Sequence, residues 1–200
     1  RSPICAIPFR KTPTGPALVT AAAGCPTIAD PQGLSDQGTI AGPTGTWRVC
    51  RLPNLIRTST SLPKVSGLLY EMNGRVNVGC DGGFNAPTAA AAFTSTTVGC
   101  TTALTADTHV TLTIAAGAIL FGGTGQSWLA VNRGNRIAAV GTATQPIVFT
   151  SRDNVLGLND DTSQGQWGGV VLMGRGVVTD CNVGSVASNT CERDTEGSAD

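Results

Sequence analysis

Charged and aromatic residues are scarce in this chain of 200 residues. Charged side chains make up 13% of the sequence and aromatic ones 4%, and the formal net charge is zero. A chain without a positive field does not attract nucleic acid or an anionic membrane surface. No apolar run approaches the roughly 18 residues that a membrane span needs. We therefore expect neither a nucleic-acid partner nor a transmembrane segment.

Catalytic groups are equally sparse. The sequence has one histidine, His109, and no Cys-x-x-Cys pair, which argues against a zinc site or a Cys–His nucleophile. Between Val110 and Phe149 there is no Asp or Glu, whereas polysaccharide lyases and hydrolases need paired carboxylates or a basic residue beside a bound cation. The arginines available are Arg133, Arg136, Arg152 and Arg175. Without an acidic partner such residues are more typical of surface hydrogen bonding, so we predict that the protein is not an enzyme.

The sequence also lacks the 3.6-residue apolar periodicity of an amphipathic helix. It is rich instead in glycine, with 26 residues, and in proline, with 11. This composition favours short strands joined by tight turns. The composition therefore predicts an all-β fold.

An alternating apolar run followed by a glycine or polar corner recurs between residues 110 and 178. Leu112, Leu129, Ile147 and Val170 lie in successive runs, at spacings of 17, 18 and 23 residues. A short strand with one apolar face can bury that face only against its neighbours, so such runs stack into a solenoid with a continuous interior. We predict a parallel β-helix in which each run forms one coil.

Prolines divide the chain unevenly, because eight of them fall within residues 1–60. They interrupt any strand or helix pattern there. We predict an irregular, disulfide-tied arm over residues 1–60, which either caps the first coil or docks on a neighbouring molecule. Residues 61–200 are predicted to form the coils, starting with a strand, a turn at Asn73-Gly74 and a second strand. Loop excursions are expected at 80–100, 151–166 and 180–200, where a solenoid usually carries its binding surface.

Seven cysteines without metal-ligand spacing predict disulfides formed in an oxidising compartment. Six of them are placed to close local loops: Cys25 with Cys50, Cys80 with Cys100, and Cys181 with Cys191. Spacing alone does not fix the connectivity. Cys5 is left over, and it pairs with another chain, pairs with sequence missing here, or stays free. The cysteines favour an extracellular protein.

Six short motifs in the repeat region stand out. They are Leu-Pro-Lys-Val-Ser-Gly (62–67), Gly-Arg-Val-Asn-Val-Gly (74–79), Leu-Thr-Ile-Ala-Ala-Gly (112–117), Leu-Ala-Val-Asn-Arg-Gly (129–134), Ile-Ala-Ala-Val-Gly-Thr-Ala-Thr-Gln-Pro-Ile-Val-Phe-Thr-Ser (137–151) and Gly-Gln-Trp-Gly-Gly-Val-Val-Leu-Met-Gly (165–174). These motifs resemble a family of bacterial secreted or surface-attached proteins with a right-handed parallel β-helix. Ala116 stands where that family often has proline.

The resemblance covers roughly the C-terminal two thirds of the chain. It implies an all-β, right-handed parallel β-helix on a bacterial cell surface, and it supplies no catalytic residues. It also implies further coils beyond a loop such as 180–200. We therefore expect the chain to be a fragment, or another polypeptide or copy to continue the stack.

Two functions follow from these observations. The first is an extracellular structural or adhesive cell-surface module, a stiff rod that associates with another surface protein or with itself into a filament through its arm and open helix end. The alternative is a carbohydrate-binding or polysaccharide-degrading β-helix protein. Trp128 and Trp167, which precede predicted strands, offer aromatic faces for a glycan.

The excursion at 151–166 also offers hard oxygen ligands. Asp153, Asp160 and Asp161 are candidates for binding Ca²⁺. Their spacing matches neither an EF-hand nor a glycine-rich calcium repeat, and a solvated turn capped by its own side chains is the alternative. We otherwise expect no cofactor.

Overall fold

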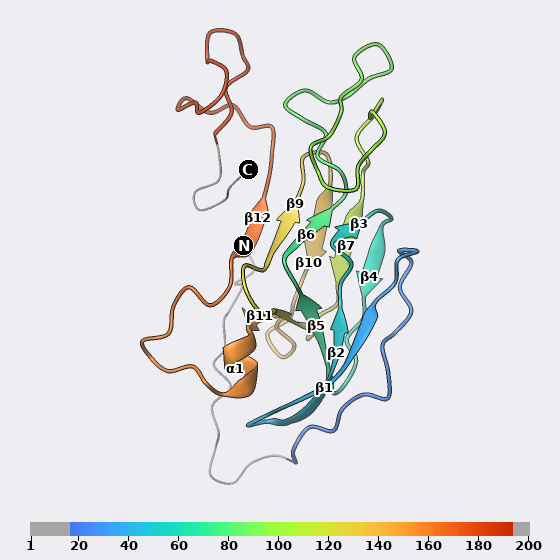
Figure 1. The fold of residues 1–200 in the computed structure, drawn as a ribbon, viewed down its shortest axis with the longest axis vertical. Coiled ribbons are helices and arrows are strands. Elements are labelled where there is room, and N and C mark those ends of the chain that lie inside the picture. Colours follow the sequence, from blue (N-terminus) through green and yellow to red (C-terminus); the bar gives the residue numbers. More distant parts are fainter. Residues whose placement is uncertain (1–16, 194–200) are drawn as a thin grey trace.

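Figure 1 shows the computed structural model, which describes residues 17–193. This part of the chain contains twelve strands and one five-residue helix, α1 (Arg152–Leu156), and the predicted all-β class is confirmed. The strands are β1 (Ser35–Gly42), β2 (Gly45–Arg51), β3 (Leu55–Ile56), β4 (Thr60–Leu62), β5 (Leu68–Met72), β6 (Arg75–Val78), β7 (Thr111–Ile114), β8 (Ile119–Gly122), β9 (Trp128–Val131), β10 (Arg136–Ala139), β11 (Val148–Ser151) and β12 (Gly169–Leu172).

The strands form three sheets, which we call A, B and C. Sheet A has the order β1-β2-β5-β8-β11, sheet B the order β12-β9-β6-β3, and sheet C the order β10-β7-β4. From β2 onward the chain visits A, B and C in turn, and each circuit adds one strand to each sheet. Neighbours within a sheet are parallel except for the pair β1 and β2. The parallel pairing predicted from the repeat is confirmed.

The predicted length of a coil is wrong. Leu112 pairs with Ile137, 25 residues later, and not with Leu129, which lies on a different sheet. Apolar runs 17 or 18 residues apart are therefore different sides of the molecule rather than stacked coils. Every strand turns apolar side chains inward whichever sheet it joins, so the hydrophobic pattern repeats several times in one circuit and conceals the circuit's true length.

The irregular arm predicted for residues 1–60 is wrong from Ser35 onward. Residues 35–51 form the antiparallel pair β1 and β2, and β3 and β4 already belong to sheets B and C. The prolines of this region are compatible with strands because Pro43 lies in the turn between β1 and β2, and Pro53 lies between β2 and β3. Residues 1–16, which include Cys5, lie outside the described part of the chain.

The interior is one cluster of aliphatic side chains contributed by all three sheets. Leu112, Leu120 and Leu129 come from sheets C, A and B, and each is completely buried. Segment 17–34 contains no named strand, but its Ile28 side chain is buried in the same cluster and Cys25 packs against it. This segment therefore covers apolar surface of the core.

Three disulfides join the cysteines that the spacing had paired. They are Cys25–Cys50, Cys80–Cys100 and Cys181–Cys191. The first ties segment 17–34 to β2, the second closes a loop within the excursion between β6 and β7, and the third closes a loop after β12. The expectation of a disulfide-stabilised protein is therefore confirmed.

The turn predicted at Asn73-Gly74 is present, with Gly74 at a φ of 73°. The strands on either side, β5 and β6, belong to different sheets and do not pair with each other. The turn is thus a corner between sheets A and B rather than a hairpin. Over residues 17–193 no helix has the length and apolar character to cross a membrane.

Candidate functional site

A pocket of about 310 Å³ opens where β11 ends and the chain leaves sheet A through α1. Its lining consists of Phe149, Thr150, Ser151, Asn154, Asn159, Ser163, Gln164, Gly165, Gln166 and Trp167. The lining combines amide and hydroxyl groups with two aromatic rings and contains no ionisable side chain. Most of it comes from the excursion 151–166, where the sequence predicted a binding surface.

Local sequence signals place the polar side chains of this pocket. Ser151 is the N-cap of α1, and its Oγ accepts a hydrogen bond from the Asn154 backbone nitrogen at 3.0 Å. Gly157 ends the helix after five residues with a φ of 71°, a left-handed conformation that suits glycine. The helix is thus held short, and the chain turns back so that residues 159–167 complete the pocket wall.

Trp167 joins the pocket to the core. Its ring is stacked on Phe149, with centroids 6.3 Å apart and planes inclined by 3°. Gly122 permits this approach, because a Cβ at that position would lie 2.5 Å from the Cβ of Trp167. The indole is therefore held in place by the buried part of sheet A while it lines the pocket.

Hydrogen bonds hold in place the polar side chains that we call the floor of the pocket, which are Thr150, Ser151, Asn154 and Gln166. Ser151 Oγ donates to Gln166 Oε1 at 2.7 Å, and Gln166 Nε2 donates to Asp153 Oδ2 at 3.3 Å. Asn154 Nδ2 donates to Thr150 Oγ1 at 2.6 Å. The floor is thus a connected set of side chains from β11, α1 and the segment before β12, which is the kind of preorganisation that a binding site uses.

The calcium candidates do not converge. Asp160 Oδ1 accepts hydrogen bonds from the backbone nitrogen and hydroxyl of Thr162 and from the hydroxyl of Ser163. Asp153 is engaged with Gln166. Within residues 17–193 no three His, Cys, Asp or Glu side chains are grouped so that they could hold a metal ion. The Asp160 geometry is that of a turn capped by its own side chain, while calcium binding stays a prediction.

The second predicted stacking residue is engaged elsewhere. The guanidinium of Arg75 lies 4.6 Å from the centroid of the Trp128 ring, a cation–π contact between neighbouring strands β6 and β9 of sheet B. Of the two tryptophans that the sequence offered for sugar stacking, the structure places Trp167 beside the pocket and pairs Trp128 with a cation.

A second hollow, of about 420 Å³, lies between segment 27–29 and sheet C. Hydroxyl side chains dominate its lining, which consists of Thr27, Ile28, Ala29, Ser59, Thr60, Ser61, Pro63, Thr111 and Thr113. No aromatic ring lines it. It therefore lacks the stacking surface that accompanies hydrogen-bonding groups in the pocket at Trp167.

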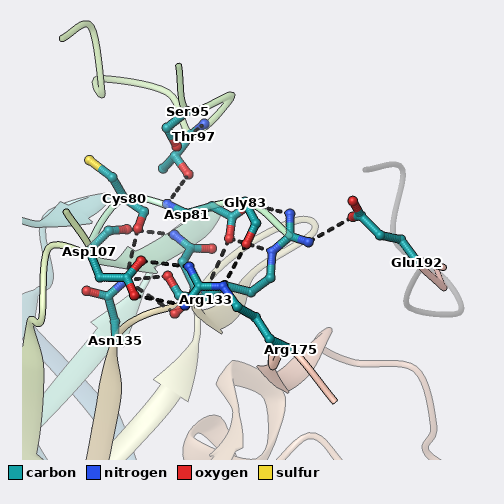
Figure 2. A network of polar contacts seen from close by, with 12 residues as sticks. Cys80, Asp81, Gly83, Ser95, Thr97, Asp107, Arg133, Asn135, Arg175 and Glu192 are labelled. Atoms are coloured by element: carbon teal, nitrogen blue, oxygen red, sulfur yellow. Dashed lines mark hydrogen bonds and ion pairs between the residues drawn. The ribbon is translucent and has the colours of Figure 1, made fainter. Parts of the chain in front are cut away.

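Figure 2 shows a separate polar network, at the end of the sheets toward which β6 and β9 point. Arg133 follows β9, and its Nη2 and Nε donate to Asp81 at 2.6 and 2.8 Å. Its Nη1 donates to Glu192 Oε2 at 2.8 Å. These bonds, those to Asp81 above all, raise the pKa of Arg133. The network joins sheet B to the excursion after β6 and to the disulfide loop after β12.

A second pair lies beside the first. Both terminal nitrogens of Arg175 donate to Asp107, at 2.8 and 2.7 Å, and Arg175 Nε donates to the Gly83 carbonyl oxygen at 2.9 Å. Glycines at 82 and 134 leave room for it, because a Cβ at either position would lie 2.0 or 2.3 Å from atoms of Asp107.

The inference that these arginines lack acidic partners is therefore wrong for Arg133 and Arg175. Their partners Asp81 and Asp107 lie 52 and 68 residues away, in the excursion between β6 and β7. These aspartates lie outside the coil strands in sequence, and the excursion that carries them folds back onto the ends of the strands. Both arginine side chains are held in ion pairs, and the network connects loops to the sheets.

The Asp107–Arg175 pair predicts a pH dependence of stability. The hydrogen bonds from Arg175 lower the pKa of the Asp107 carboxyl, whose side chain is 9% exposed. A carboxyl whose pKa is lower in the folded than in the unfolded state stabilises the fold at pH values above its unfolded pKa, which for Asp is about 3.9. This stabilisation is lost as the pH falls through the folded pKa. We expect the free energy of unfolding, measured by urea titration, to fall between about pH 5 and pH 1. Asp107→Asn should flatten this dependence, whereas Asp36→Asn, at a more exposed pair, should not. Equal slopes in both variants would contradict the assignment.

Arg136 and Arg152 take no part in either site, and the charge of His109 makes only the last and smallest contribution to the lowered pKa of Asp107. His109 is exposed and has a φ of 50°, just before β7. Neither Arg136 nor Arg152 belongs to an ion pair among the residues that the structure describes, and neither lines the pocket.

Comparison with known proteins gives one match. A family model described as a pectate-lyase-like β-helix domain matches residues 91–198, just over half of the chain. The matched range contains α1 and all ten residues that line the pocket. No curated protein and no solved structure matches the chain.

Proposed function

The chain belongs to the family of pectate-lyase-like β-helix domains, and from this premise we propose that it is an extracellular module that binds a glycan in the pocket at Trp167. The three circuits of strands are the coils of a right-handed parallel β-helix, and the excursions carry the binding surface. Three disulfides support an oxidising, extracellular location, which we place at a bacterial cell surface.

The observation that carries this proposal is the chemistry of the pocket lining. Amide and hydroxyl groups surround a fixed indole ring. Sugars present hydroxyl groups around their rim and an apolar C–H face, so they match a polar wall beside an aromatic plane. A pocket of about 310 Å³ is at the lower end of the range for small-ligand sites and suits one sugar unit of a longer chain.

We propose binding without cleavage. Glycosidic bond cleavage needs a proton donor and a base or nucleophile in contact with the bond. No ionisable side chain lines the pocket, and Arg133 and Arg175, each paired with an aspartate, hold loops at the other end of the sheets. A protein that binds a glycan without cleaving it is also consistent with the adhesive module that the sequence predicts.

The filament hypothesis stays a second prediction. It depends on the predicted N-terminal arm and on an open helix end, and Cys5 of that arm lies outside the described residues. A glycan-binding module and a self-associating one differ in their partner, so a glycan panel separates the two.

We would test the proposal with two amides of the pocket, the half-buried Asn159 and the exposed Gln164. Asn159 and Gln164 line it and make no side-chain hydrogen bond within residues 17–193, so Asn159→Ala/Gln164→Ala should leave folding intact. Each lost hydrogen bond is worth about 0.5–1.5 kcal/mol, so we expect affinity to fall roughly 5- to 150-fold. The matched control is Asn85→Ala/Gln126→Ala, two exposed amides outside the pocket.

The measurement is binding to a panel of neutral and acidic polysaccharides by calorimetry, together with an assay for new reducing ends and unsaturated products. Equal loss of affinity in the control would show that the pocket is not the site. Product formation would show an enzyme, and a lack of binding to every glycan would contradict the function itself.

A further inference from the structure

The floor of the pocket selects one class of sugar, an inference that rests on the proposed glycan-binding function. We propose that the pocket takes a neutral sugar ring with adjacent hydroxyl groups and rejects sugars that carry a carboxylate or sulfate group. The proposal rests on an unpartnered acceptor in the floor, on the donors beside it, and on the charges of the surrounding segment.

The acceptor is the side-chain oxygen of Asn154. This residue is only 7% exposed, and its side-chain nitrogen donates to Thr150, but its oxygen has no hydrogen-bond partner in the described residues. Every polar side-chain atom there that is fully shut off from solvent does have a partner. The Asn154 oxygen is therefore not fully shut off from solvent, and we take the pocket that the residue lines as its route of access. An ionised carboxylate or sulfate has no proton to give it, whereas a sugar hydroxyl does.

Two donors accompany this acceptor. Thr150 Oγ1 accepts the bond from Asn154, which leaves its own proton free to donate. Gln166 Nε2 gives one hydrogen to Asp153 and has a second. Adjacent sugar hydroxyls satisfy one acceptor and two donors together, since each hydroxyl both donates and accepts. An anionic group would satisfy the donors and leave the Asn154 oxygen facing a negative charge.

The surrounding segment reinforces this selection. Between residues 149 and 167 there are three carboxylates, Asp153, Asp160 and Asp161, and one guanidinium, Arg152, giving a formal charge of −2. Asp153 holds the pocket's Gln166 directly, whereas Arg152 does not line the pocket. A segment with net negative charge repels an anionic sugar.

Two of the arginines that could pair with an acidic sugar are engaged elsewhere. Arg133 and Arg175 are held by Asp81 and Asp107 in the network of Figure 2. No cation lines the pocket. Acidic chains such as polygalacturonate therefore find no counter-charge at Trp167, although the chain belongs to a pectate-lyase-like family.

The test uses the unmodified protein and polysaccharides matched in backbone. Polygalacturonate, alginate and hyaluronate are each compared with their carboxyl-reduced forms at constant ionic strength, next to neutral glucans, mannans and xylans. We expect neutral chains to bind and, in any pair that binds, the reduced form to bind roughly tenfold or more tightly than the acidic form. Tighter binding of the acidic forms would overturn the inference and leave the glycan-binding function standing. Absence of binding to every glycan would remove both.

A charge-introducing variant then locates the selection. Gln164 is exposed and lines the pocket, so Gln164→Lys supplies the missing cation without disturbing the fold. We expect it to raise affinity for acidic chains about tenfold at low salt, and to lower affinity for neutral chains roughly 2- to 13-fold because the Gln164 amide hydrogen bond is lost. The control Gln126→Lys adds the same charge at an exposed position outside the pocket. An equal gain in the control would show that general surface charge, not the pocket, sets the preference.

Discussion

Replacing Arg133 by methionine is expected to lower the free energy of unfolding by about 3–5 kcal/mol. The Arg133 side chain is 17% exposed and the Asp81 side chain it pairs with is 10% exposed. Removing one partner of a largely buried pair leaves the other charge desolvated and uncompensated, and this penalty exceeds the net value of the pair itself. Glu192 loses its partner in the same step.

A double-mutant cycle separates this effect from simple loss of packing. Arg133→Met/Asp81→Asn removes both charges, so it should recover part of the loss seen in Arg133→Met. The surface pair of Arg193 and Asp180, whose side chains are largely exposed, provides the control. Arg193→Met should cost no more than about 1 kcal/mol. Similar losses at the two arginines in urea titrations would show that burial of the network does not matter.

Leu129→Ala is expected to lower the free energy of unfolding by about 2–5 kcal/mol. Leu129 is completely buried in the central cluster, between Val76 of β6 and Val170 of β12 in the register of sheet B. Truncation removes apolar contacts and leaves a cavity between three stacked strands, which closely packed neighbours fill only in part.

Leu172→Ala is the matched control, because the two leucines sit on adjacent strands of one sheet. Leu172 is 65% exposed on β12, so its truncation removes little buried area and should change stability by less than about 1 kcal/mol. Both values come from chemical denaturation followed by far-ultraviolet circular dichroism. A comparable loss in both variants would mean that the described packing of sheet B is wrong.

Part of this fold could be predicted from residue order alone. The alternating runs around Leu112, Leu129 and Val170 do form strands with inward leucine and valine side chains, and these strands pair in parallel. Alternation is a local property of a strand that buries one face, so it is legible in sequence. The pairing of strands could not be predicted from the sequence, because the strands of all three sheets bury the same kind of side chain.

The candidate site shows the same division. The excursion 151–166 and Trp167 were identified as places to look, because loops and aromatic residues carry binding surfaces. The orientation of Asn154 was not foreseen, since it depends on Ser151 capping α1 and on Thr150 at the end of β11. The acidic partners of Arg133 and Arg175 were missed because they are remote in sequence.

Composition and alternation by themselves determined that this protein is built from short parallel strands with tight corners, stabilised by disulfides and free of a net charge. Tertiary structure decided the length of a circuit, the strands of residues 35–62, the pairing of each arginine, and the pocket at Trp167. The physical reason is range. Backbone preference and burial act between near neighbours and leave a pattern in the chain, whereas charge pairing and pocket shape arise only when distant segments are brought into contact.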